Sequence, residues 1–139
     1  MEDLLSENPL RCRLAADIAR RVSSRQPGIF CGYIDVLIDL LACLPLEQWQ
    51  SRGYVSLAAA NSAVTVAQRR RLAALVRPML EDKRTAVRAN GLETFAILAQ
   101  GEPELREEVL TLLEESRIAG TPSMRARARR MLKRLSSSR

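Results

Sequence analysis

The chain has 139 residues, of which 47% are hydrophobic, 27% are charged and 4% are aromatic, and its formal net charge is +6. This length fits one domain, and the balance of apolar and charged residues argues against wholesale disorder. The sequence contains no histidine, which removes the usual general base and the commonest metal ligand. We therefore expect no enzyme activity, no catalytic residues, no metal and no cofactor.

Two features bear on where the protein works. The chain shows no charged leader followed by an apolar run and a small-residue cleavage site, so no secretion signal is predicted. The longest apolar run, residues 28–46, contains Asp35 and Asp39. If this run crossed a membrane, the two carboxylates would lie near the centre of the bilayer, where they are costly. The run is therefore predicted to be a helix buried in the protein core. We expect a cytoplasmic protein with no membrane partner and no small-molecule substrate.

Proline and glycine divide the chain into seven predicted helices joined by short connections. A proline in the first turn, as at Pro9, Pro103 and Pro122, is typical of a helix start. Gly101 is typical of a helix end. No segment alternates with period two for long enough to predict a strand. The predicted helices cover residues 9–25, 27–43, 46–61, 65–81, 83–99, 102–118 and 121–135.

Four stretches of the chain align in one register. They start at Leu10, Trp49, Val87 and Met124, which are 39, 38 and 37 residues apart, and the positions four and eight residues further on match as well. A period of this size is typical of stacked helix pairs, because one pair cannot bury its apolar face alone. The sequence therefore predicts an all-α helical repeat.

Residues 80–95 resemble the turn and second helix of a HEAT repeat. In that family an Asp in the turn precedes an Arg by six residues, and Asp82 and Arg88 match this pattern. The other three units keep the hydrophobic spacing but lack the Asp. The resemblance, which covers about residues 9–135, implies a right-handed α-solenoid of about seven antiparallel helices. It also implies that one layer, made of the helices at 9–25, 46–61, 83–99 and 121–135, lines the concave side.

The whole chain, 1–139, is thus expected to be a single HEAT-like repeat domain. Its expected parts are an N-terminal helix at 9–25, helix-pair repeats at 27–63, 64–101 and 102–135, and a tail at 136–139. The residues predicted to be mostly buried are Leu14, Ile18, Leu37, Leu41, Trp49, Leu57, Leu75, Leu92, Phe95, Leu98, Leu112 and Leu132.

Positive charge is concentrated in the helices of the expected concave layer. Segments 9–25, 46–61, 83–99 and 121–139 hold 16 Lys/Arg and 3 Asp/Glu, whereas the rest of the chain holds 6 Lys/Arg and 13 Asp/Glu. In the repeat register, Arg11, Gln50, Arg88 and Arg125 are equivalent, and so are Arg13, Arg52, Asn90 and Arg127. The register predicts two rows of donors along this layer. In the other layer the signs alternate between repeats, which predicts inter-repeat ion pairs.

The like-signed rows suggest a non-enzymatic binding scaffold or adaptor that recognises a protein partner through an acidic surface. The alternative is a nucleic-acid backbone binder that uses the same basic surface, although few aromatic residues are present for base stacking. A third interpretation is structural, in which some arginines, Arg88 first, are internal ties and the last helix is a polar cap. The candidate partner-binding residues are Arg11, Arg13, Arg52, Arg88, Arg125, Arg127, Arg130 and Arg134.

Overall fold

The computed structural model describes residues 2–63 and 65–137. Its elements in chain order are α1 (Pro9–Arg25), the 3₁₀ helix η1 (Cys31–Tyr33), α2 (Ile34–Cys43), α3 (Trp49–Ser62), α4 (Val66–Val76), the 3₁₀ helix η2 (Arg77–Glu81), α5 (Thr85–Ala99), α6 (Pro103–Ala119) and α7 (Pro122–Ser137). These residues contain no strand, so the predicted all-α class is confirmed. α7 reaches into the predicted tail at 136–139, and residues 138–139 of that tail, like the predicted repeat boundary at 64, lie outside the described residues.

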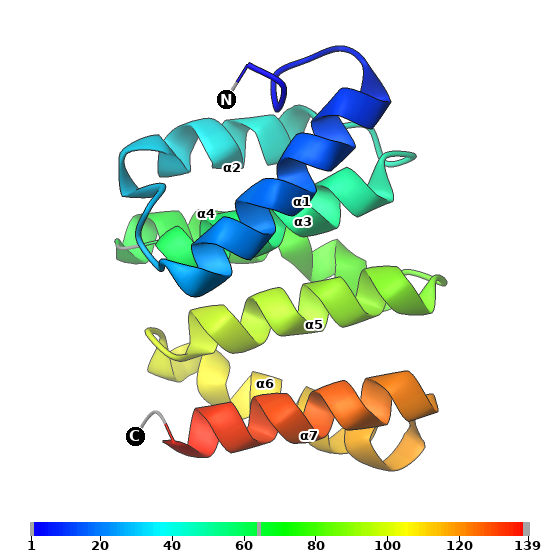
Figure 1. Ribbon diagram of the computed structural model, residues 1–139. Coiled ribbons are helices and arrows are strands. Elements are labelled where there is room, and N and C mark those ends of the chain that lie inside the picture. The colour runs from blue at the N-terminus through cyan, green and yellow to red at the C-terminus, as the bar shows by residue number, and fades with distance from the viewer. Residues whose placement is uncertain (1, 64, 138–139) are drawn as a thin grey trace.

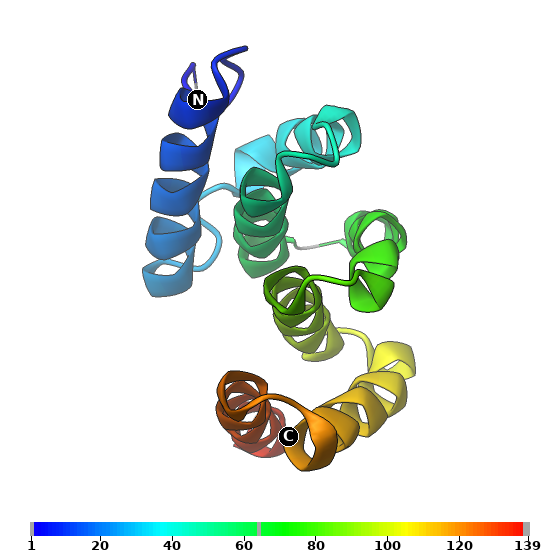
Figure 2. The ribbon, with the colours of Figure 1, turned by 90° about the vertical axis from the view of Figure 1, so that its right-hand side faces the viewer.

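The helices lie in two layers (Figure 1). The inner layer consists of α1, α3, α5 and α7, in which each helix packs against the next. The outer layer consists of α2, α4 and α6, each packed on one or two inner helices. Seen from the side, the stack forms a C whose open side is lined by the inner layer (Figure 2). The first and last helices of the inner layer, α1 and α7, therefore stand at opposite ends of the stack.

One continuous core joins all seven helices, from Cys12 in α1 to Leu135 in α7. Phe95, in the middle of the inner layer, has no exposed surface. Half of the predicted core is confirmed as buried, namely Leu37, Leu41, Leu57, Leu92, Phe95 and Leu98. Four further predicted residues, Trp49, Leu75, Leu112 and Leu132, are only partly buried and pack against the core from its edge.

The predicted core is wrong in α1. Leu14 is 54% exposed and Ile18 is 61% exposed, whereas the buried face of α1 consists of Cys12, Ala16, Ala19 and Ser23. This face packs on α3, where Asn61 Nδ2 donates a hydrogen bond to Ser23 Oγ at 3.2 Å. Because small side chains let two helices approach closely, α1 docks through them and turns its large aliphatic residues outward.

The repeat register also fails at the level of single side chains. Gly53 and Gly91 are equivalent in the alignment, yet they face different neighbours. A Cβ atom added at Gly53 would lie 2.5 Å from Asn90 Nδ2 of α5, and one added at Gly91 would lie 3.0 Å from Met79 Cβ of η2. The near-constant period therefore records the length of a helix pair, but it does not carry each side chain to an equivalent face.

Three predicted helices differ from the structure by three residues or more at one end. Residues 27–33 were expected to be α-helical, but Gly28 has φ +89°, which a right-handed helix does not accommodate, and α2 begins only at Ile34. α3 begins at Trp49 instead of residue 46. The fourth helix was expected to bend near Pro78, and the chain does change there from α4 to the 3₁₀ helix η2, because proline cannot continue the α-helical hydrogen bonds.

Candidate anion-binding surface

A pocket of about 710 Å³ lies at the α7 end of the inner layer, between α5 and α7. Four of its lining residues are cations, Arg127, Arg130, Lys133 and Arg134, and one is a carboxylate, Glu93. Gln100 and Met131 complete the lining. We call this site the α5–α7 pocket.

The amphipathic pattern of α7 explains why its cations gather there. Its buried residues, Met124, Ala128, Met131 and Leu135, recur at spacings of three and four and so form one stripe against the core. The cations at 127, 130, 133 and 134 flank that stripe on the side facing α5. Arg106 of α6 donates a hydrogen bond from Nη2 to the main-chain oxygen of Leu135 at 2.6 Å, which satisfies a carbonyl in the last turn of α7.

The cations of the pocket differ in how they are neutralised. Arg127 Nη2 lies 3.5 Å from Glu93 Oε2, so one arginine offsets the only carboxylate. Arg130 and Arg134 are exposed, and neither makes a hydrogen bond or ion pair with any residue that the structure describes. A surface with two unneutralised guanidinium groups can take up an anion through bidentate hydrogen bonds.

Two of the predicted binding residues are engaged inside the molecule. Arg52 Nη1 donates hydrogen bonds to the main-chain oxygens of Leu41 at 2.9 Å and Leu44 at 2.7 Å, at the end of α2. Burial lowers the pKa of Arg52 below its ordinary value because the charged form loses hydration. The guanidinium of Arg52 therefore closes the turn between α2 and α3, and its assignment to a partner-binding surface stays a prediction.

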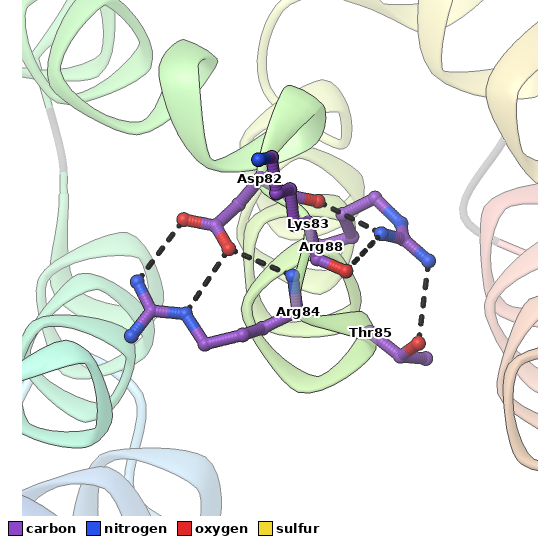
Figure 3. Close-up of polar contacts among 5 residues, drawn as sticks. All are labelled: Asp82, Lys83, Arg84, Thr85 and Arg88. Carbon is purple, nitrogen blue, oxygen red and sulfur yellow. Dashed lines mark hydrogen bonds and ion pairs between the residues drawn. The ribbon is translucent and has the colours of Figure 1, made fainter.

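Arg88 has a similar role at the turn between η2 and α5 (Figure 3). Its Nη1 donates to the main-chain oxygens of Asp82 at 2.8 Å and Lys83 at 2.9 Å, and its Nη2 donates to Thr85 Oγ1 at 3.2 Å. Arg88 is thus an internal tie of the turn before α5. Its structural interpretation is confirmed, and its assignment as a partner-binding residue stays a prediction.

The carboxylate of Asp82 bonds to a different arginine from the one that the family pattern implies. Asp82 Oδ1 accepts from the main-chain N–H of Arg84 at 2.8 Å and from Arg84 Nε at 3.1 Å, and Oδ2 accepts from Arg84 Nη2 at 3.2 Å (Figure 3). These hydrogen bonds, the side-chain ones first, lower the pKa of Asp82. Arg88 therefore hydrogen-bonds to the main-chain oxygen of Asp82 and acts on the Asp82 carboxylate only through its charge, which adds a smaller contribution to the lowered pKa.

The predicted row of Arg13, Arg52, Asn90 and Arg127 does not form one exposed line of donors, because its members turn to different partners. Arg13 Nη1 donates to Gln50 Oε1 of α3 at 3.1 Å, whereas Arg127 turns to Glu93 of α5. Between them in the predicted row, Arg52 is engaged at the end of α2, and Asn90 is buried against Gly53.

The remaining predicted residues divide between the ends of the stack. Arg11 lines a groove beside α1, and Arg125 is exposed on α7 but does not line the α5–α7 pocket. Only Arg127, Arg130 and Arg134 of the eight are brought together. Lys133 belongs with them and was missed, although its spacing of three from Arg130 places it near that face.

Inter-repeat ion pairs cross the outer layer with partners other than those of the register. Asp39 of α2 pairs with Arg71 of α4, and Arg77 of η2 pairs with Glu108 of α6. The second interaction raises the pKa of Arg77, mainly through the hydrogen bond with Glu108. Arg71 and Arg77 of this layer are thus neutralised by carboxylates, whereas Arg130 and Arg134 are not neutralised by any described residue.

Within the described residues, no group of three or more Cys, Asp or Glu side chains is placed to hold a metal ion. None of the helices in that part of the chain is both long and apolar enough to cross a membrane. Comparison of the chain with models of known protein families, with curated proteins and with solved structures gives no match.

Proposed function

We propose that the chain is a non-enzymatic binding scaffold, built as a right-handed HEAT-like α-solenoid, that recognises an acidic segment of a protein partner through its inner layer. The observation that carries this proposal is the α5–α7 pocket, in which four cations surround one carboxylate. The repeat period and the match of Asp82 and Arg88 to the HEAT pattern support the architectural part. The C-shaped stack is consistent with the curved binding surfaces of helical repeat proteins.

The distribution of paired and unpaired arginines favours the α7 end of the stack as the binding site for an acidic partner. Arg71 and Arg77 of the outer layer already hold carboxylates, so an acidic partner would have to displace them. Arg130 and Arg134 have no such competitor among the described residues. Positive charges at the wall of a pocket raise the local concentration of an acidic ligand and speed its association.

A nucleic-acid backbone is the second candidate ligand, because phosphates match the same arginines. The positions of the aromatic rings make it the weaker one. The guanidinium carbon of Arg20 lies 5.0 Å from the centroid of the Tyr54 ring, and that of Arg84 lies 5.6 Å from the centroid of Trp49. Phe95 is fully buried, and no aromatic residue lines the α5–α7 pocket. Base stacking, which supports much single-strand binding, has no platform beside these cations.

The test compares two double variants of α7 that change the net charge equally. Arg130→Glu/Arg134→Glu reverses the unneutralised pair of the pocket, and Arg125→Glu/Arg129→Glu reverses two exposed arginines outside it. Fluorescence anisotropy with a labelled glutamate-rich peptide and with a labelled duplex DNA measures both ligands. We expect the first variant to weaken peptide binding by at least about tenfold, and the control by much less, because salt screens charges outside the contact.

Ionic strength separates the two candidate ligands. Binding to duplex DNA through phosphates alone falls steeply, because each neutralised phosphate releases about 0.9 of a counterion. An equal loss of peptide binding in both double variants would mean that only the total charge matters, and the proposed site would be wrong. Tight, salt-resistant DNA binding with sequence preference would contradict the proposed class of partner.

A further inference from the structure

The outward face of α1 carries large aliphatic side chains that no other part of the described chain covers. Leu10, Leu14 and Ile18 follow one another at spacings of four and are 54%, 54% and 61% exposed. At about 100° per residue they fall within an arc of about 80°, on the side of α1 turned away from α3. Three exposed residues in one stripe differ from the scattered apolar residues of an ordinary surface.

A groove of about 690 Å³ runs beside this stripe. Leu14 and Ile18 form one wall of the groove, Phe30 contributes from the segment after α1, and Leu4 contributes from the turn before it. The groove is therefore apolar along most of its length and has room for side chains from a second helix. Asp3 and Arg11 supply its polar lining.

The charges at the two ends of α1 are opposite. Glu2, Asp3 and Glu7 precede the helix, and all three are exposed. At the other end, Arg21 and Arg25 are exposed and lie in register with the aliphatic stripe, seven and eleven residues after Leu14. Arg21 Nη2 also lies 2.9 Å from Asp17 Oδ2 of its own helix, so Arg25 is the cation of this end that holds no carboxylate among the described residues. A second copy of α1 placed antiparallel would bring its acidic end against this basic end, and the reverse contact would form at the opposite end of the pair.

We propose that this face is the interface of a symmetric dimer, in which α1 packs antiparallel on α1 of a second copy. With Leu14 near the two-fold axis, Leu10 of one copy lies level with Ile18 of the other, and Arg21 lies level with Glu7. The contact is isologous, because the same patch serves both copies. The charge complementarity selects a second copy as the occupant, since the stripe and its charged ends match themselves when reversed.

Net charge does not oppose this contact. Residues 2–25 contain five arginines and four acidic residues, whereas residues 121–139 contain seven cations and no acidic residue. Because α1 and α7 stand at opposite ends of the stack (Figures 1 and 2), two copies joined through α1 hold their most basic ends apart. The α5–α7 pocket stays open in each copy, so the dimer does not depend on the proposed function.

Sedimentation equilibrium of the full chain tests the dimer, at concentrations from about 1 µM to about 1 mM, the range over which small interfaces associate. The average mass should rise from 15.5 kDa toward twice that value. Leu14→Glu should weaken the association by about a hundredfold or more, because the symmetric contact loses a buried leucine twice. Ile118→Glu is the matched control, since Ile118 is 69% exposed on α6.

A charge exchange tests the antiparallel arrangement. Arg21→Glu/Arg25→Glu makes both ends of α1 acidic, and Asp3→Arg/Glu7→Arg makes both ends basic. Each variant alone should be monomeric under conditions in which the unmodified chain dimerises, and an equimolar mixture of the two should recover a dimer. Circular dichroism of each variant verifies that the helices are retained, so that a lost dimer is not mistaken for a lost fold.

Three results would overturn the proposal. The unmodified chain would stay monomeric up to the highest concentration, or a dimer would survive Leu14→Glu and Ile18→Glu unchanged. The third is a folded Arg21→Glu/Arg25→Glu variant that dimerises as well as the unmodified chain, because this would mean that the acidic and basic ends do not meet.

Discussion

The two ends of the inner layer occupy equivalent places and expose opposite chemistry. α7 buries large residues, with Met131 6% and Leu135 0% exposed, and presents arginines to solvent. α1 buries small residues, with Cys12 1% and Ala16 0% exposed, and presents Leu14 and Ile18. Each of these helices has an inner-layer neighbour on one side only.

This difference shows that a terminal position in a helical stack does not by itself make the free face of a helix polar. A helix at the end of a stack has one covered face and one free face, and the sequence decides which residues occupy each. At the α7 end the free face is cationic and suits an acidic ligand. At the α1 end it is aliphatic and suits association.

The largest expected effect concerns the core that both ends share. Phe95→Ala should lower the free energy of unfolding by about 3–5 kcal/mol, as is typical for the truncation of a fully buried aromatic residue. Urea unfolding followed by circular dichroism and by Trp49 fluorescence should show one coincident transition. A loss below about 1 kcal/mol, or separate transitions for the two probes, would mean that Phe95 does not pack in one cooperative core shared by the helices.

The contrast between the ends predicts unequal costs for the same substitution. Leu135→Ala in α7 should cost about 2–5 kcal/mol of unfolding free energy, because Leu135 has no exposed surface. Leu14→Ala in α1 should change that free energy by no more than about 0.5 kcal/mol when measured on the monomer at low concentration. Similar costs for both variants in urea unfolding would remove the difference between the ends.

A smaller effect is expected where the two halves of the inner layer meet. Gly53→Ala should destabilise the fold by about 1–3 kcal/mol, since its Cβ would lie 2.5 Å from the side chain of the buried Asn90. Gly32→Ala is a suitable control, because an added Cβ there meets no atom within 4 Å. If thermal unfolding shows equal midpoints for the two variants, α3 and α5 do not require the close approach.

The smallest effect concerns acid stability at the turn before α5. Because the hydrogen bonds from Arg84 lower the folded-state pKa of Asp82 below its ordinary value of 3.8, Asp82 stabilises the fold above that pH. This contribution is lost as the pH falls through the folded-state pKa. The difference in unfolding free energy between the unmodified chain and Asp82→Asn should therefore shrink as the pH falls from 3.8 through the lowered folded-state pKa. A difference that stays constant with pH would show that the pKa is not lowered.

The sequence was sufficient for the helices but not for the covered face of α1. Leu10, Leu14 and Ile18 have the spacing and size of core residues, and nothing within the helix distinguishes them from residues that a neighbour covers. The face that packs, Cys12–Ala16–Ala19–Ser23, is only weakly hydrophobic. Whether this face packs depends on how closely α3 can approach α1, and the sequence of one helix alone does not determine that distance.

The candidate site was also predictable only in part, because local spacing indicates some of its residues and tertiary contacts determine the others. Arg127, Arg130 and Arg134 lie on one face of a helix, and their proximity follows from local spacing. The engagement of Arg52 and Arg88 depends on main-chain oxygens that turns present to them, and a charge count does not reveal such acceptors. The spacing of Lys133 from Arg130 likewise places it near that face, but which residues beside the apolar stripe reach the pocket depends on the orientation of α7 against α5.

The most direct measurement for the α5–α7 pocket is a titration of the ¹⁵N-labelled chain with the glutamate-rich peptide, followed by backbone amide NMR shifts. The proposed function predicts saturable shifts confined to the facing parts of α5 and α7, around Glu93, Gln100 and Arg127 to Arg134. The amides of α1 and of the outer layer should stay unchanged. Shifts spread evenly over exposed cations such as Arg25 and Arg70, or centred on α1, would contradict the assignment of the binding surface to the α7 end of the stack.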